Sequence, residues 1–230
     1  RSTVLNTENI YGSRAGDTLV GSAGDNEIYG EAGSDLIYGG DGGRDLLYGG
    51  ADNDVIIGAK KLKQVGTSTN TSFNGGVGND WMQSSIGNDW IDGNDPSEAD
   101  AAKAKNTFTT NPSNTNLSGG YSYLSQGDSL DYGYLAKGWT VTVTLNGDVY
   151  VEATVRDAGG SVRERDKVKN VENLIGGAGN DPINGDANGN VLDGGGGDDS
   201  VNAGGGDDVI LASGGGNDSV NGGEGTDELS

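Results

Sequence analysis

Apolar residues recur every nine positions along much of the chain, each two residues after an acidic or amide side chain in a glycine-rich hexapeptide. The pattern is Gly-Gly-x-Gly-x-Asp-x-U-x, where U is apolar, and residues 194–202 show it in full as Gly-Gly-Gly-Gly-Asp-Asp-Ser-Val-Asn. A fixed short period predicts a stacked solenoid, because one repeat can bury its apolar side chain only against its neighbours.

Position 8 of the repeat is apolar in all thirteen copies: Leu19, Ile28, Ile37, Leu47, Ile56, Met82, Ile91, Ile183, Leu192, Val201, Ile210, Val220 and Leu229. Side chains alternate along a strand, so we expect position 8 to point inward and positions 7 and 9 outward. Two nonapeptides then make one turn of a flattened parallel roll. Loops on one edge lie eighteen residues apart, which pairs Asp181 with Asp199 and Asn190 with Asp208. Gly39 and Ala212 are interpreted as one-residue insertions.

Position 6 carries the candidate chemistry. It is Asp17, Asn26, Asp35, Asp45 and Asp54 in a first array, Asp80 and Asp89 in a short second one, and Asp181, Asn190, Asp199, Asp208, Asp218 and Asp227 in a third. Stacking would place these carboxylates in columns, where they repel one another unless they are neutralised. Glycine permits sharp turns with positive φ, and carboxylate and carbonyl oxygens together suit a hard divalent cation. We therefore expect metal binding to be coupled to folding.

This motif resembles the RTX (repeats-in-toxin, hemolysin-type) nonapeptide family. The resemblance implies a right-handed parallel β-roll with Ca²⁺ between adjacent loops of one edge, export by type I secretion and folding outside the cell. Asn26 and Asn190 each lack a charge, so we expect weaker sites there. The calcium ligands that the resemblance implies are Asp17, Asn26, Gly30, Gly33, Asp35, Gly40, Gly42, Asp45, Gly49, Gly50, Asp52, Asp54, Gly75, Gly76, Gly78, Asp80, Asp89, Gly176, Gly177, Gly179, Asp181, Gly185, Asn190, Gly194, Gly195, Gly197, Asp199, Gly204, Gly206, Asp208, Gly214, Gly216, Asp218, Gly222, Gly223, Gly225 and Asp227.

Composition narrows the choice of function. The chain has 230 residues, 45 of them glycine, and a hydrophobic content of 32%, which is typical of a thin roll rather than a conventional core. The formal net charge is −21, which about ten Ca²⁺ ions would cancel and which makes nucleic acid and anionic membranes poor partners. The chain has no His, which excludes a Ser-His-Asp hydrolase, and no Cys, which is compatible with an extracellular protein that has no disulfides. We expect no catalytic residue and no membrane span, although paired carboxylates leave a glycosidase-like dyad open.

The arrays divide the chain into three predicted segments of an all-β protein. Residues 1–93 form a first roll with an insertion at 59–74, residues 94–170 form a non-repeat β and irregular insert, and residues 171–230 form a second roll. In the insert we expect a short helix at 97–105, a polar loop at 106–120, and a hairpin of strands 139–145 and 149–155 around Asn146-Gly147. These strands are expected to cover an end or flank of a roll.

The outward positions also differ between arrays. In the first array they include Tyr29, Tyr38 and Tyr48, whereas in the third they are mainly polar. We expect a covered face on the first roll, with a sugar-binding tyrosine stripe as the alternative. Both long arrays open on a similar motif, Glu8-Asn9-Ile10-Tyr11-Gly12 and Glu172-Asn173-Leu174-Ile175-Gly176, which favours tandem modules.

The favoured function is a non-catalytic calcium-binding module of a secreted protein, with the remainder of a larger parent protein as its partner. One alternative is a segment of a surface adhesin or S-layer-type protein that binds glycans or a cell surface. Another is the C-terminal accessory domain of a secreted lipase, protease or polysaccharide-modifying enzyme. Asp95-Pro96 and Asp181-Pro182 resemble the Asp-Pro bonds that some RTX-associated modules cut, and chance dipeptides are the favoured interpretation.

Overall fold

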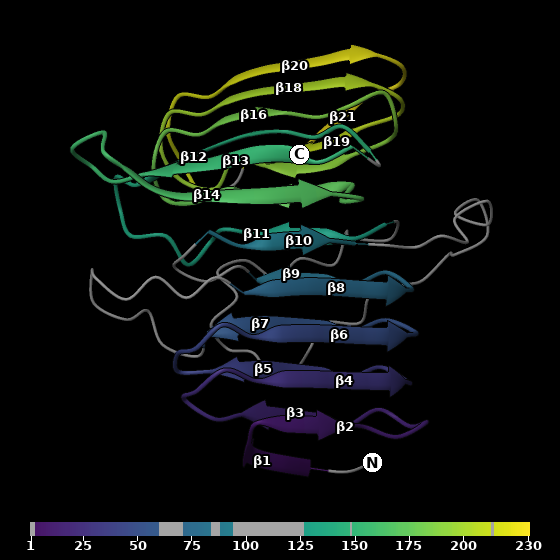
Figure 1. Ribbon diagram of the computed structural model, residues 1–230. Helices are drawn as coiled ribbons and strands as arrows, with labels where there is room; N and C mark the ends of the chain where they lie inside the picture. The colour runs from purple at the N-terminus through teal and green to yellow at the C-terminus, as the bar shows by residue number, and fades with distance from the viewer. Residues whose placement is uncertain (1–2, 60–70, 84–87, 94–126, 148, 213) are drawn as a thin grey trace.

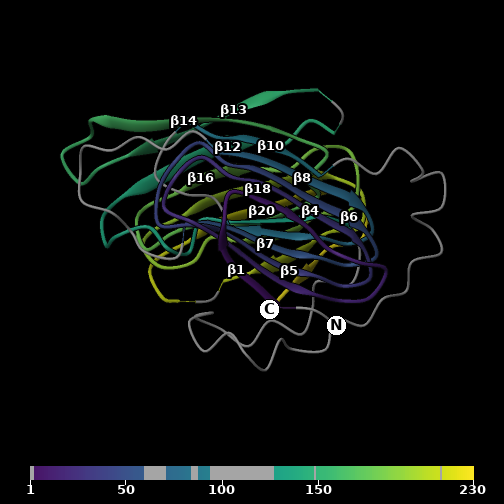
Figure 2. The same cartoon turned by 60° about the horizontal axis from the view of Figure 1, so that its bottom comes forward.

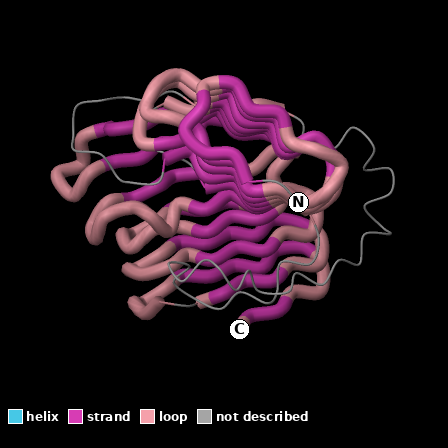
Figure 3. Tube along the Cα trace, turned by 90° about the horizontal axis from the view of Figure 1, so that it is seen from below, coloured by secondary structure: helices cyan, strands magenta, loops and turns pink. Residues whose placement is uncertain are grey.

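The chain folds as two facing sheets of stacked strands. The computed structural model describes residues 3–59, 71–83, 88–93, 127–147, 149–212 and 214–230. In these residues every regular element is a β-strand (Figure 1). Seen along the stack, the strands form two walls joined by turns (Figures 2 and 3). The predicted helix at 97–105 and loop at 106–120 lie outside the described residues.

The first wall is a ten-stranded sheet. Its strands, in spatial order, are β1 (Thr3–Thr7), β3 (Thr18–Gly21), β5 (Leu36–Gly40), β7 (Val55–Ala59), β9 (Trp81–Gln83), β11 (Ser129–Asp131), β15 (Asn173–Ile175), β17 (Val191–Asp193), β19 (Val209–Leu211) and β21 (Glu228–Leu229). All neighbours in this sheet are parallel, as for β3 with β5 and β9 with β11.

The second wall is an eleven-stranded sheet. It contains β2 (Asn9–Tyr11), β4 (Glu27–Ala32), β6 (Leu46–Ala51), β8 (Ser72–Val77), β10 (Trp90–Asp92), β14 (Val162–Lys169), β13 (Val151–Arg156), β12 (Thr140–Thr144), β16 (Pro182–Asn184), β18 (Ser200–Gly205) and β20 (Ser219–Glu224). The repeats thus alternate between the two sheets, and the predicted all-β parallel roll is confirmed. The short second array continues the first, because β8 to β10 follow β6 and β7 in the same sheets.

Position 8 of the repeat forms the core. Eleven of the thirteen predicted side chains are buried, as strand alternation requires; in β4, for example, Ile28 is buried between the half-exposed Glu27 and Tyr29. Val220 is only partly buried, and Leu229 is 62% exposed on β21, which has a neighbouring strand on one side only. The apolar stack therefore weakens towards the last strands.

The central segment joins the sheets and does not cover them. The predicted antiparallel pair is confirmed as β12 and β13, and β14 adds a third strand. The tight turn at Asn146-Gly147 is not, because the pairing ends at Thr142 with Thr154, and Val143 and Thr144 pair with β16 instead. Of the two expected positions, the end of a roll is confirmed and its flank is wrong, because β14 pairs in parallel with β10, and β12 in parallel with β16. Their free backbone edges make better partners for sheet edges than for a sheet face. Strands of the first and third arrays therefore share both sheets, while the division of the chain into domains stays a prediction.

In the central segment the two walls have different numbers of strands. Between β9 and β15 the first wall has β11 alone, whereas between β10 and β16 the second wall has three strands. Two extra strands lengthen the second wall by about 10 Å. Large side chains fill the resulting wedge, since Tyr132 and Leu135 are buried and Tyr134 and Trp139 pack against the same core.

The predicted tyrosine stripe is split between the two outer faces. Tyr29 and Tyr48 lie on the eleven-stranded sheet, where Tyr11 stacks on Tyr29. Tyr38 lies on the other sheet and packs on a second apolar cluster that includes Ile57, Trp81 and Ile175. Successive repeats occupy opposite walls, so residues nine apart cannot share a face. The first array does bury part of an outer face, as expected, and Ile175 links that cluster to the start of the third array.

Candidate metal centres at the roll edges

The position-6 residues stack in two columns, one on each edge of the roll. Column 1 precedes the strands of the ten-stranded sheet, and column 2 precedes those of the eleven-stranded sheet. In column 1 the Asp17 N–H donates to Asp35 Oδ1 at 2.6 Å, and the Asp35 N–H donates to Asp54 Oδ1 at 2.8 Å. The two eighteen-residue pairs predicted from the sequence are confirmed, with N···Oδ1 distances of 2.9 Å for Asp181 to Asp199 and 2.7 Å for Asn190 to Asp208.

The second carboxylate oxygen divides the turns into two kinds. In Asp35, Asp54, Asp199 and Asp208 the Oδ2 atom is buried and has no hydrogen-bond partner within the protein. An unsatisfied buried polar atom is costly, and a carboxylate oxygen more so. These four atoms therefore require a positively charged or proton-donating partner.

The other kind of turn satisfies this oxygen itself. The Ser13 N–H donates to Asp17 Oδ2 at 2.8 Å, and the Gly177 N–H donates to Asp181 Oδ2 at 2.7 Å. These two turns, and those of Asn26 and Asn190, belong to the first two repeats of each long array. Asp17, Asn26, Asp181 and Asn190 are therefore placed in the columns as predicted, but their side chains are already engaged.

Backbone conformation at position 2 separates the two kinds. Gly50, Gly195 and Gly204 have φ of +120°, +83° and +104° and precede Asp54, Asp199 and Asp208 by four residues. At Ser13 and Gly177 φ is not positive, and the N–H points back to the position-6 side chain. A left-handed conformation at position 2, which glycine adopts readily, thus leaves the carboxylate Oδ2 without this N–H donor. We call such a turn an open turn. Glu31 adopts the same conformation before Asp35, with φ of +82°.

The glycine at position 1 makes room for oxygen atoms. A Cβ added to Gly49 would lie closer than 3.0 Å to both Asp54 Oδ2 and the carbonyl oxygen of Gly75 in the next coil. Gly30 has the same relation to Asp35 Oδ2 and the Gly49 carbonyl oxygen. Carboxylate and carbonyl oxygens are the ligands that Ca²⁺ takes in proteins. The open turns therefore fit a calcium ion.

Gly39 also lines a cradle, by which we mean the space that a position-1 glycine leaves for a carboxylate and a carbonyl oxygen. Its interpretation as an inserted residue is therefore wrong. A Cβ on Gly39 would clash with Asp45 Oδ2 and with the Gly58 carbonyl oxygen, as at Gly30 and Gly49. Gly40 has φ of +125° and corresponds to Gly50. The extra residue of this repeat therefore lies between Gly40 and Gly43.

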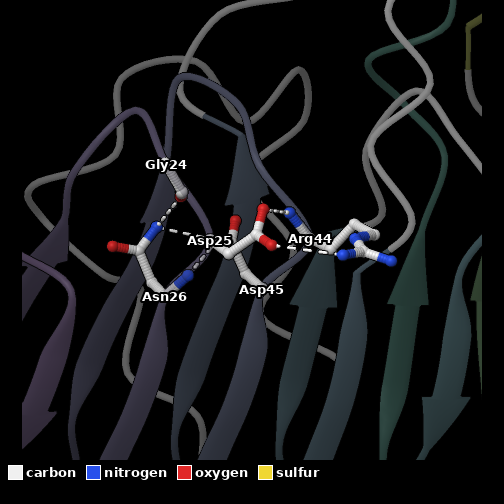
Figure 4. Close-up of polar contacts among 5 residues, drawn as sticks. All are labelled: Gly24, Asp25, Asn26, Arg44 and Asp45. Carbon is white, nitrogen blue, oxygen red and sulfur yellow. Dashed lines mark hydrogen bonds and ion pairs between the residues drawn. The ribbon is translucent and has the colours of Figure 1, made fainter.

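Asn26 replaces a carboxylate by an amide that donates hydrogen bonds (Figure 4). Its Nδ2 donates to Asp45 Oδ1 at 2.7 Å, to the Gly24 carbonyl at 2.6 Å and to the Gly39 carbonyl at 2.9 Å. The amide thus occupies carbonyl oxygens that a cation would otherwise use. Beside it, Arg44 pairs with Asp25 at 3.4 Å on the exposed rim, where an ion pair contributes little.

Burial raises the pKa values of the carboxylates in both columns. Desolvation raises the pKa of Asp54 to about 9, although the Asp35 N–H lowers it, and the charges of Asp80 and Asp35 raise it further. Desolvation likewise raises the pKa of Asp45 and Asp181 to about 7, and of Asp35 and Asp199 to about 6. The buried columns thus favour a bound cation or a proton over a bare charge.

Besides Glu8, which precedes the buried Ile10 of β2 in the same way, four further residues stand at position 6 that the sequence analysis missed: Thr71, Asp128, Asp166 and Glu172. The Thr71 N–H donates to Asp89 at 2.7 Å, and the Asp89 N–H to Asp166 at 2.9 Å. Each of the four precedes a buried apolar residue by two positions, as in Asp128-Ser129-Leu130. That spacing was the available signal, but the missing glycines concealed it.

In the described part of the chain, no group of three or more His, Cys, Asp or Glu side chains is placed to hold a metal ion. A calcium ion in these turns therefore depends on backbone carbonyl oxygens as well as carboxylates. The described residues also contain no helix of the length and apolarity that a membrane crossing needs.

A family model described as the RTX calcium-binding nonapeptide repeat (four copies) matches residues 11–43, 40–60, 65–95, 175–210 and 210–229, which is more than half of the chain. The chain belongs to the RTX calcium-binding repeat family. The RTX repeats indicate a calcium-binding structural module of an RTX-type protein, and such repeats are typical of secreted proteins. No curated protein matches the chain.

Replacing Gly49 by Ala is expected to lower the stability of the calcium-loaded protein by about 1–3 kcal/mol, because the methyl group fills the cradle of Asp54. Gly24→Ala is the matched control, since its Cβ would lie 3.6 Å from the nearest atom, Ser22 Oγ. Urea unfolding at saturating calcium measures both variants. Equal losses would contradict the assigned role of Gly49.

Acid is expected to stabilise the calcium-depleted roll. The folded state raises the pKa of Asp54 from 3.8 to about 9, so it binds a proton more tightly than the unfolded chain does. This stabilisation is complete below about pH 4 and is lost as the pH rises towards 9. Circular dichroism of calcium-depleted protein across this range measures it, and Asp54→Asn should flatten the dependence. A loss of β-structure on acidification would refute the expectation.

Proposed function

We propose that this chain is a non-catalytic calcium-dependent module that folds and stiffens a secreted parent protein outside the cell. The observation that carries the proposal is the set of buried Oδ2 atoms of Asp35, Asp54, Asp199 and Asp208, which have no hydrogen-bond partner in the protein. At Asp35 and Asp54 the position-1 glycines, Gly30 and Gly49, also leave space for a carbonyl oxygen of the next coil. The type I route of export is part of this proposal and rests on family resemblance.

In each open turn, different oxygen atoms would fix the register between coils and bind the ion. The position-6 Oδ1 holds the N–H of the preceding coil and fixes the register between coils. The Oδ2 and the position-1 carbonyl oxygen would hold the ion. A bound Ca²⁺ would supply the positive charge that offsets repulsion along the column. At low calcium, repulsion within the columns disfavours the folded roll. Extracellular calcium modules have dissociation constants of about 10⁻⁴–10⁻³ M, so a module of this kind would fold at the calcium concentrations found outside the cell.

Calcium is expected to convert the chain from a coil-like to a β-rich state. Far-ultraviolet circular dichroism with excess EDTA and then with millimolar CaCl₂ measures the change, and MgCl₂ is the matched ion control because Mg²⁺ accepts irregular carbonyl sites poorly. Asp54→Asn should shift the midpoint to higher calcium. A β spectrum that persists in EDTA at neutral pH would sink the proposal.

Glycan or surface binding is a second candidate, favoured by the outer face of the eleven-stranded sheet. Tyr11, Tyr29 and Tyr48 stack with ring centroids 5.0 and 4.6 Å apart, and Tyr11 is 65% exposed. Trp90, 52% exposed, lies on the same sheet with its ring edge against Tyr150. Tyr29 is covered on both faces by its neighbours, so the exposed rings of Tyr11 and Trp90 provide the apolar surface for a sugar.

If this face binds sugars, the triple variant Tyr11→Ser, Tyr29→Ser and Tyr48→Ser is expected to lose glycan-array signals that the calcium-loaded protein gives. Tyr38→Ser is the matched control, because Tyr38 lies on the opposite sheet. Only variants with an unchanged calcium midpoint enter the comparison. Signals that survive the triple substitution, or no signal from the parent chain, would remove this candidate.

A further inference from the structure

Column 1 continues beyond the repeats. The family match leaves residues 96–174 uncovered. Nevertheless, the Asp80 N–H donates to Asp128 Oδ1 at 2.8 Å, as the Asp54 N–H does to Asp80 Oδ1 at 2.8 Å. The Asp128 N–H in turn donates to Glu172 Oε2 at 2.7 Å. Two acidic residues from outside the repeats thus take the next two places in the column.

The glycine cradle also continues. A Cβ on Gly75 would lie closer than 3.0 Å to Asp80 Oδ2 and the Gly93 carbonyl oxygen. A Cβ on Gly93 would lie equally close to Asp128 Oδ2 and the carbonyl oxygen of Asn170. Gly93, Asp128 and Asn170 come from three separate stretches of chain, and they reproduce the arrangement of Gly49, Asp54 and Gly75. The oxygen donors are again carboxylates and carbonyls.

The same coil is held in register by the core. Leu130 pairs with Met82 on one side and Leu174 on the other, and all three side chains are fully buried. On the opposite wall Ile91 pairs with Val168. The central strands therefore present Asp128 and Asn170 at the height where the next repeat would stand.

In column 2, the carboxylate of the central segment is satisfied by hydrogen bonds within the protein. Asp166 accepts the Asp89 N–H at 2.9 Å, and its Oδ2 accepts the hydroxyl hydrogen of Tyr132 at 2.8 Å. A buried hydroxyl thus meets the carboxylate in column 2. In column 1 the cradle of Gly93 brings a carbonyl oxygen towards Asp128. A carbonyl oxygen only accepts hydrogen bonds, so it cannot form one with a carboxylate.

We propose that Asp128, together with Asp80 and the carbonyl oxygens of Gly93 and Asn170, forms a calcium site outside the repeats. Glu172 ends this stretch of the column, because Asn190 follows it with a neutral amide whose Nδ2 donates to the Glu172 carbonyl at 2.9 Å. The site fastens β11 and the end of β14 to the first array. β15 then pairs with β11, while β14 is followed by β13 and β12, on which β16 of the third array stacks. The inference rests on the proposed calcium-dependent folding.

Asp128→Asn tests the site, because it removes the charge and keeps the shape. We expect native mass spectrometry to count fewer calcium ions on this variant than on the parent chain. Hydrogen exchange at increasing calcium should show residues 129–147 and 162–175 becoming protected at about fivefold higher calcium or more, the lower end of typical coupling between sites. Residues 12–59 should become protected at the unchanged concentration.

Asp157→Asn is the matched control, since Asp157 lies in the same central segment but at an exposed hairpin turn with Arg163. It should leave the ion count and every protection midpoint unchanged. If Asp128→Asn does not fold at any calcium concentration, Asp80→Asn, which removes the charge of the other carboxylate of the site, makes the same comparison of midpoints. An unchanged ion count and unchanged protection of 129–147 in the Asp128 variant would overturn the inference. Absence of calcium-dependent protection in the parent chain would instead overturn the proposed function.

Discussion

The roll depends on burying one carboxylate in each open turn. One oxygen atom of that carboxylate accepts the backbone N–H of the preceding coil, which fixes the spacing and register of the stack. The other is buried without a hydrogen-bond partner in Asp35, Asp54, Asp199 and Asp208, and in Asp35 and Asp54 it lies beside a carbonyl oxygen of the next coil. The interaction that builds the stack therefore also buries a charge that the protein alone does not neutralise, and the proposed coupling of folding to calcium binding follows from this.

Glycine has two separate tasks around this carboxylate. At position 1 it leaves the space in which carboxylate and carbonyl oxygens meet, as Gly49 does for Asp54. At position 2 it adopts a positive φ, as in Gly50, and so turns its N–H away from the carboxylate. Where position 2 is Ser13, the N–H instead satisfies Asp17. The first repeats of each array thus end the column with protein hydrogen bonds, and the later ones leave it open.

The central segment solves a problem of continuity. Two arrays that stacked independently would each expose a sheet edge, and exposed edges invite unwanted pairing. Strands β11 to β14 pair with both arrays and remove that edge, although they give the second wall two more strands than the first. Buried Tyr132 and Leu135 fill the wedge between the unequal walls. The segment is thus part of the roll, even though most of its residues do not follow the repeat.

The sequence by itself determined the parallel roll, the inward stack at position 8 and the eighteen-residue pairing of the acidic columns. These follow from a local period, since a residue such as Ile28 or Asp199 has the same neighbours in every coil. Only the tertiary structure decided that Tyr38 and Tyr48 face opposite sides, that Asn26 uses its amide against the Gly39 carbonyl, and that Asp128 and Glu172 join column 1. These outcomes depend on how distant segments meet, and on backbone φ at single turns, neither of which a repeating pattern specifies.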